Sequence, residues 1–193
     1  MGVGKILSSI NAKNLAAVTL TFILATSILG PFASAESSAE HPVGSGLEEW
    51  WIAYPDQHSK AGSAVDHPSW ALDALKEKPV MMLIHSSGCP ACIKQEADIN
   101  KVLEDLGDEV AYLDLSTDSD GEKAWEGLDI YDPKGGVMTY VPVTVFLTQV
   151  PESDGDAEIS WHSAVGYGGE RWIRSYLNDA IALHTENSAN WDR

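Results

Sequence analysis

The chain is poor in cysteine and in basic residues. Its 193 residues include two Cys, and 12 Lys and Arg stand against 29 Asp and Glu. A structural zinc site needs about four ligands, so the lack of a second cysteine pair argues against one. The net charge of −17 excludes a surface suited to nucleic acid or to an anionic membrane, because both repel negative charge. Internal repeats and low-complexity segments are also absent.

Acidic residues are missing before Glu36, and the first 35 residues have the pattern of a secretory signal. Lys5 and Lys13 give a basic start, Leu15–Leu29 is mostly apolar, and positions 33–35 read Ala-Ser-Ala, the small-x-small form of a cleavage site. The apolar run is shorter than the roughly 20 residues of a membrane span. We therefore expect cleavage and an extracytoplasmic protein. The alternative is an uncleaved anchor, a membrane tether through residues 1–35 that holds the chain at the outer face of the cell membrane.

Removal of residues 1–35 leaves 158 residues with a net charge of −19, enough chain for one domain with a sizeable core. Residues 36–65 are predicted to be a linker and an aromatic N-terminal extension, with a flexible tether at 37–46. Residues 47–54, which contain Trp50 and Trp51, are expected to form a short helix packed on the domain, or else a surface for a partner. Residues 66–185 are predicted to form the domain and residues 186–193 a frayed tail. We expect the protein to be a monomer.

Both cysteines lie in the stretch Gly88-Cys89-Pro90-Ala91-Cys92. An apolar run at 79–84 precedes it and is typical of a buried strand, and apolar residues at helical spacing follow it to residue 106. Gly88 suits the turn between them, and Pro90 suits a first helical turn. A helix N-terminus stabilises a thiolate, so we expect Cys89 to have a lowered pKa and to be the nucleophile, with Cys92 as the resolving thiol.

Two other interpretations of the cysteine pair stay open beside this redox one. A structural disulfide would constrain the unfolded chain very little across a two-residue loop. A copper site would need a histidine in addition to the two thiols.

The remaining pattern predicts an α/β domain. A helix is expected over 66–78, with Asp66 as its N-cap and Pro68 in its first turn. Strands at 79–84 and 109–115 flank the helix after the cysteines, which makes a βαβ unit with parallel strands. An acidic segment follows, with a short helix at 122–128, and then come strands at 142–147 and 158–165, paired antiparallel, and a helix over 170–184.

From about residue 66 to residue 184 the chain resembles the thioredoxin family, with which a C-x-x-C motif near a βαβ unit is associated. The resemblance rests on Cys89-Pro90-Ala91-Cys92 at a strand-to-helix junction, on Val141-Pro142 before a core strand, on Val165-Gly166 after the last strand, and on the closing amphipathic helix. It implies a thioredoxin-like fold, with a mixed sheet of about four strands flanked by helices. It further implies a cis Val141–Pro142 bond beside the cysteines, with Val141 and Pro142 contacting the substrate.

The activity implied is that of an extracytoplasmic thiol–disulfide oxidoreductase without a cofactor or a metal. Its partners would be protein thiols and disulfides together with a redox partner. A module that carries copper, or that binds a partner without turnover, is the alternative. His85 and Glu96 are candidates for tuning the thiols. The chain departs from thioredoxin at Gly88, where the family has a tryptophan, and at Leu83, where it has a buried aspartate.

Overall fold

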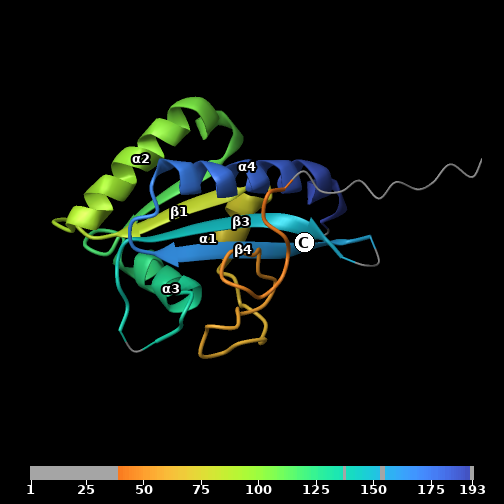
Figure 1. Cartoon of the computed structure of the whole chain (residues 1–193), viewed down its shortest axis with the longest axis horizontal. Coiled ribbons are helices and arrows are strands. Elements are labelled where there is room, and N and C mark those ends of the chain that lie inside the picture. The colour runs from red at the N-terminus through yellow and green to blue at the C-terminus, as the bar shows by residue number, and fades with distance from the viewer. Residues whose placement is uncertain (1–38, 137, 153–154, 192–193) are drawn as a thin grey trace, which may run out of the picture. The chain divides into compact units, whose positions relative to one another are not determined.

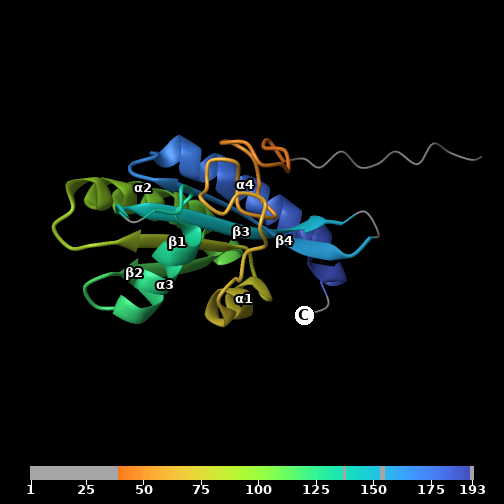
Figure 2. The same ribbon diagram turned by 90° about the horizontal axis from the view of Figure 1, so that it is seen from below.

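The computed structural model describes residues 39–136, 138–152 and 155–191, so the predicted signal at 1–35 lies outside the described residues. A central sheet has helices on both of its faces (Figures 1 and 2). Within the described ranges no helix is both long and apolar enough to cross a membrane. In chain order the elements are α1 (Ser69–Leu75), β1 (Val80–His85), α2 (Pro90–Leu106), a 3-10 turn (Gly107–Glu109), β2 (Ala111–Ser116), α3 (Gly121–Tyr131), β3 (Val143–Pro151), β4 (Ala157–Val165), α4 (Glu170–Asn187) and a second 3-10 turn (Ser188–Asn190).

The sheet has the strand order β2-β1-β3-β4. Strand β1 runs parallel to β2, with Val80 opposite Ala111, and antiparallel to β3, with Leu83 opposite Thr144. Strand β4 pairs antiparallel with β3 at the outer edge. The prediction of a mixed four-stranded sheet flanked by helices is confirmed.

Strand β1 separates two hydrophobic cores. Its side chains alternate in direction, so Met81 and Leu83 face the core under α2 and α4, while Met82 and Ile84 face the core over α1 and α3. All four are fully buried. A strand covered on both faces requires a continuous apolar run, which is what the sequence has before the cysteines.

The N-terminal extension pairs with the free edge of β4 at Trp51. The Trp51 amide donates to the Trp161 carbonyl at 2.8 Å, and the Trp161 amide donates back at 2.9 Å. Because neighbouring side chains of an extended chain point in opposite directions, Trp50 enters the core under α4 and Trp51 enters the other core. The prediction that this segment packs on the domain is confirmed, and the helix predicted for it is wrong.

The flexible tether predicted at 37–46 is also wrong for the residues that the structure describes. The Asp179 carboxylate on α4 accepts the backbone N–H of Glu40 at 2.7 Å and that of His41 at 2.9 Å. The His41 ring contacts the same carboxylate and stacks on Tyr176 with the ring centres 3.9 Å apart. A buried carboxylate on the far helix therefore holds this small, polar segment in place.

The ends of several elements differ from the predicted ones. Helix α1 begins after Pro68, which is its N-cap in place of Asp66, and α3 is longer than the predicted 122–128. Helix α4 continues through Asn187. The side-chain amide nitrogen of Asn187 donates to the backbone carbonyl of Gln149, near the end of β3, at 3.2 Å. The predicted frayed tail is therefore ordered helix and 3-10 turn as far as residue 190.

We predict that Trp51→Ala lowers the free energy of unfolding by about 3–5 kcal/mol, because it leaves a cavity between the extension and the sheet. The Trp51 ring is 1% exposed and packs against Trp161 and His162. Urea unfolding measures the loss. Trp125→Ala is the matched control: that side chain is 57% exposed, so its change should stay within about 0.5 kcal/mol. Equal losses in the two variants would contradict the packing assigned to Trp51.

A second prediction concerns His162, whose pKa burial lowers from 6.5 to about 4. The unfolded chain binds this proton more readily, so the free energy of unfolding should fall by about 3 kcal/mol as the pH drops from about 6.5 to about 4. In His162→Gln, which keeps a donor for the Glu49 carbonyl, this part of the pH dependence should disappear. An NMR titration of the His162 ring with a midpoint near 6.5 would contradict the assignment.

Candidate active site at the Cys89–Cys92 pair

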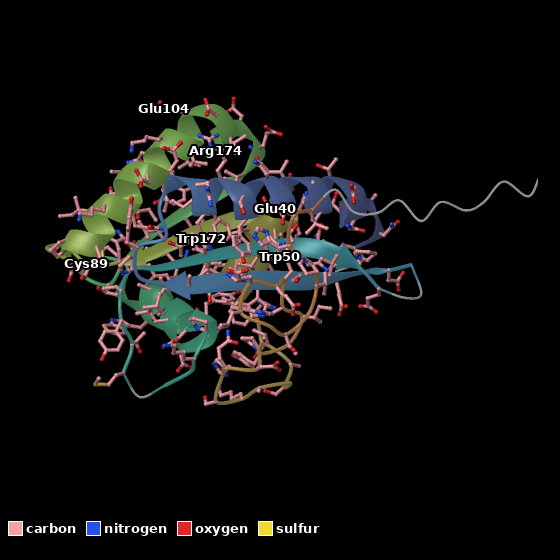
Figure 3. The ribbon with its side chains drawn as sticks, viewed as in Figure 1. Glu40, Trp50, Cys89, Glu104, Trp172 and Arg174 are labelled. Atoms are coloured by element: carbon pink, nitrogen blue, oxygen red, sulfur yellow. A yellow bond between two sulfur atoms is a disulfide. The ribbon has the colours of Figure 1, made fainter. Side chains whose placement is uncertain are left out.

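The cysteine pair lies where β1 gives way to α2, as predicted. Gly88 makes the turn with a φ of +79°, a conformation that residues with a side chain rarely adopt. Cys89 is the N-cap of α2, and Pro90 is the first helical residue. Figure 3 shows Cys89 at this start of the helix. The amide of Cys92 donates to the Cys89 sulfur at 3.2 Å, so the helix end already directs an N–H at the sulfur predicted to react.

The two sulfurs form a disulfide with a Cα–Cα distance of 5.2 Å. The two cysteines differ in exposure, because Cys89 is half-buried while Cys92 is 1% exposed. An attacking thiolate has to be reached by a partner, whereas a resolving thiol needs to reach only its neighbour. The roles of nucleophile for Cys89 and of resolving thiol for Cys92 stay predictions.

Val141 and Pro142 lie directly beside the pair, as the resemblance implied. The Val141–Pro142 peptide bond is cis, which confirms that prediction. The Val141 carbonyl oxygen lies 3.7 Å from the Cys89 sulfur. The carbonyl of Pro142 accepts the Gly166 amide at 2.7 Å, which ties the start of β3 to the end of β4. This backbone forms one wall of the site, and the role of Val141 and Pro142 in binding a substrate stays a prediction.

The His85 side chain contacts Asp114 on the neighbouring strand β2. Its Nε2 atom lies 3.0 Å from a carboxylate oxygen of Asp114 on β2, and its backbone carbonyl accepts the Thr117 amide at 2.8 Å. Glu96 is half-buried on α2, and its charge acts on Tyr112 of β2. Its charge is one of the causes that raise the pKa of Tyr112, after burial and the charge of Asp114. Tuning of the thiols by His85 or Glu96 stays a prediction.

The start of the acidic segment packs against the loop that carries the cysteines. Asp118 accepts the Ser87 amide at 2.6 Å, and this hydrogen bond lowers the pKa of the Asp118 carboxyl. The carboxylate of Asp120 accepts the Ser116 amide at 3.2 Å, within the same turn. An ionised side chain therefore positions the residues directly before Gly88.

Gln95 is a buried polar residue of the site that the sequence reasoning missed. Its amide nitrogen donates to the Thr144 hydroxyl at 2.9 Å, and its amide oxygen accepts the Gly168 amide at 2.9 Å. The residue is fully buried on α2, one turn after Cys92. It thus joins the helix of the cysteines to β3 just after Pro142 and to the loop before α4. The available signal was its spacing, since it falls on the apolar face of α2 between Cys92 and Ile99.

The Gln95 side chain binds the strand residue opposite the position at which thioredoxin has its buried aspartate. Leu83 stands at that position, and its partner across the β1–β3 pair is Thr144, which Gln95 binds. The hydrogen bonds of Gln95 to Thr144 and Gly168 are therefore made by neutral groups, which do not change charge as the pH changes.

The described parts of the chain hold no group of three or more His, Cys, Asp or Glu side chains placed to hold a metal ion. The candidate histidine ligand for a copper site is His85, and its ring contacts the carboxylate of Asp114.

No protein-family model and no curated protein sequence matches the chain. Among solved structures it is similar to a chloroplastic thioredoxin z, at 14% identity and a TM-score of 0.41, over 59% of this chain and 89% of the other. It is also similar to the Malassezia sympodialis thioredoxin Mala s 13, at 16% identity and a TM-score of 0.41, over 58% of this chain and 86% of the other. The chain has a thioredoxin-like fold. This assignment rests on the strand order and the flanking helices, not on these two likenesses.

We predict that Gln95→Leu lowers the free energy of unfolding by about 2 kcal/mol, because it leaves the buried Thr144 hydroxyl without its partner and removes the acceptor of the Gly168 amide. Asn100→Leu is the control on the same helix, at an exposed position, and should change stability by no more than about 0.5 kcal/mol. Adding Thr144→Val to Gln95→Leu should cost less than the sum of the two single losses, because the second change removes an already unpaired hydroxyl. Strictly additive losses would show that the two side chains do not interact.

Proposed function

We propose that the protein is a thiol–disulfide oxidoreductase that works through the Cys89–Cys92 pair. The observation that carries the proposal is the asymmetry of the pair. Cys89 is half-buried and is the N-cap of α2, while Cys92 is buried one turn behind it. A partial positive charge at the helix N-terminus and the N–H of Cys92 both favour the thiolate of Cys89.

In the reducing direction, the Cys89 thiolate attacks one sulfur of a partner disulfide. A mixed disulfide forms, and the other partner sulfur leaves as a thiolate that takes up a proton. Cys92 then loses its proton and attacks the Cys89 sulfur, so the partner leaves as a dithiol and the Cys89–Cys92 disulfide closes. Two electrons pass from the protein to the partner. In the opposite direction the same steps oxidise a partner dithiol.

The substrate segment is proposed to bind in an extended form beside Val141 and Pro142. The Val141 carbonyl lies 3.7 Å from the Cys89 sulfur, so a strand that hydrogen-bonds to this backbone would bring its own sulfur next to the nucleophile. Backbone recognition tolerates many side chains, which suits an enzyme that acts on several protein partners.

The extracytoplasmic location also belongs to this proposal. Its support is the basic and then apolar start of the chain, with Ala-Ser-Ala at 33–35. Disulfides persist in compartments outside the cytoplasm, where partner disulfides are available for exchange. We further propose that the protein acts as a monomer on protein thiols and disulfides.

The test uses two variants that differ only in which sulfur remains. Cys92→Ser should accumulate mixed disulfides with partner proteins, because the resolving step is lost, and Cys89→Ser should trap none. Both should lose catalysis of insulin reduction by dithiothreitol, and both should stay folded, since a disulfide that closes so short a loop stabilises little. In the reduced wild type, iodoacetamide at mildly acidic pH should label Cys89 before Cys92, with mass spectrometry as the readout.

The opposite order of labelling, or trapping by Cys89→Ser, would overturn the assignment of the nucleophile. Tight Cu(I) binding by the reduced pair together with no insulin reduction would favour the carrier function instead.

A further inference from the structure

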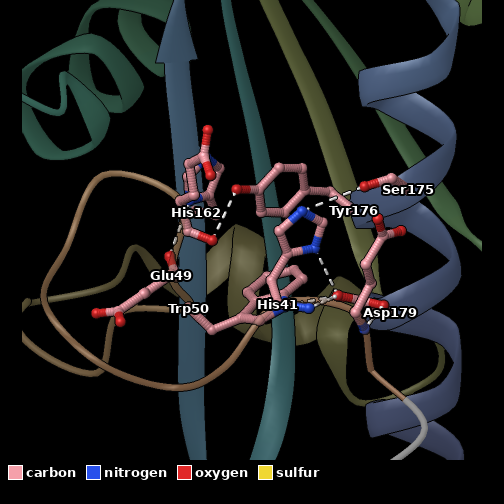
Figure 4. Close-up of polar contacts among 9 residues, drawn as sticks. His41, Glu49, Trp50, His162, Ser175, Tyr176 and Asp179 are labelled. Atoms are coloured by element: carbon pink, nitrogen blue, oxygen red, sulfur yellow. Dashed lines mark hydrogen bonds and ion pairs between the residues drawn. The ribbon is translucent and has the colours of Figure 1, made fainter.

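A second cluster of reactive side chains lies away from the cysteines, between the N-terminal extension and α4. Ser175 and Asp179 stand one turn apart on α4, and the His41 ring lies against both of them (Figure 4). His41 Nδ1 is 2.7 Å from Asp179 Oδ2, and His41 Nε2 is 3.3 Å from the Ser175 hydroxyl oxygen. Segments 134 residues apart in the sequence thus place a hydroxyl, an imidazole and a carboxylate in line.

The contacts determine which nitrogen of His41 carries the proton. An ionised carboxylate only accepts hydrogen bonds, so Nδ1 must be the N–H that donates to Asp179. In the neutral ring Nε2 then has a free lone pair, and the Ser175 hydroxyl donates to it. This is the tautomer that a general base needs in order to take a proton from a serine.

Asp179 is well placed to orient the imidazole. Its side chain is 5% exposed, and it also accepts the backbone amides of Glu40 and His41. The His41 ring cannot turn freely, because it stacks on Tyr176 with the ring centres 3.9 Å apart. The carboxylate and the stacked ring together hold Nε2 toward Ser175.

The cluster opens into a cavity of about 670 Å³ that a small molecule can enter. Its lining includes Ser175 and His41, the Trp172 ring as an apolar wall, and Arg171 one turn before Ser175. Arg171 adds a positive charge to the lining of the cavity, and positive charge stabilises the tetrahedral intermediate of acyl transfer. Glu40 and Glu48 also line the cavity, which favours neutral over anionic substrates.

We propose that Ser175, His41 and Asp179 form an acyl-transfer site that hydrolyses small neutral carboxylic esters carrying an aromatic or apolar group. The Ser175 oxygen attacks the ester carbonyl carbon while its proton passes to His41 Nε2. The bond to the alcohol oxygen breaks, and the alcohol leaves with that proton. Water then attacks the acyl-serine, again giving its proton to His41, and the acid leaves as Ser175 is restored. The site uses neither cysteine, so it is independent of the function proposed above.

The experiment uses the chain with both cysteines replaced by serine, so that no thiol reacts with the probe. With p-nitrophenyl acetate this protein should release p-nitrophenol faster than the buffer does, and a fluorophosphonate probe should modify Ser175, as located by mass spectrometry of peptides. Ser175→Ala should return hydrolysis to the buffer rate and abolish the modification. His41→Gln should lower the rate at least about 100-fold, the smallest usual effect of a general base.

Thr185→Ala is the matched control on the same helix. The Thr185 hydroxyl donates to the Ile181 carbonyl at 2.7 Å and is therefore occupied, so this variant should keep the full rate and the full modification of Ser175. Circular dichroism of Ser175→Ala should match that of the parent, since the change removes one hydroxyl. Equal hydrolysis by Ser175→Ala and its parent, or a probe that modifies other serines and leaves Ser175 untouched, would overturn the proposal.

Discussion

The backbone pairing between Trp51 and Trp161 is the interaction on which the arrangement of this molecule depends. Strand β4 is the outer strand of the sheet, and an uncovered edge leaves backbone groups free to pair with other chains. Two hydrogen bonds at Trp51 cover part of this edge. They also set the direction of the extension, so that two consecutive tryptophans fill opposite faces of the sheet. The extension is therefore a structural part of the domain.

The same pairing creates the second cluster. Once Trp50 enters the core under α4, the chain just before it must cross that helix, and Asp179 binds it there through backbone and ring contacts. The histidine that meets Ser175 comes from this crossing segment. The helix thus provides the hydroxyl and the carboxylate, and the extension provides the imidazole, so the cluster exists only when the extension is docked.

Much of the fold was predictable because its central features are local in sequence. The apolar run of β1, the glycine turn, the first-turn proline and the spacing of the apolar residues of α2 all act within a few residues of Cys89. They place the cysteines correctly at a strand-to-helix junction. The position of Val141 and Pro142 beside them required the family resemblance, because no local pattern relates Cys89 to Val141, 52 positions further along the chain.

The features that sequence reasoning missed depend on contacts between distant segments. The extension has the composition of a tether up to residue 46, and the contacts that fix its path, such as those to the Asp179 carboxylate on α4, come from distant segments. The spacing of Gln95 places it on the apolar face of α2, but its role depends on Thr144 and Gly168, which are distant in the sequence. The end of α4 also depends on a distant contact, because the Asn187 side chain donates to the backbone carbonyl of Gln149 on β3.

The buried amide of Gln95 limits how the redox site responds to pH. A carboxyl group beneath the cysteines would change its charge with the protonation of its surroundings, and a low dielectric would transmit that charge strongly to the sulfurs. Gln95 and Thr144 keep the hydrogen-bonded link between α2 and β3 but carry no charge. This link between the helix of the cysteines and the sheet therefore contributes no charge that changes with pH. Because Gly168 belongs to this network and also lines the cavity of Ser175, one short loop connects the structural support of the two sites.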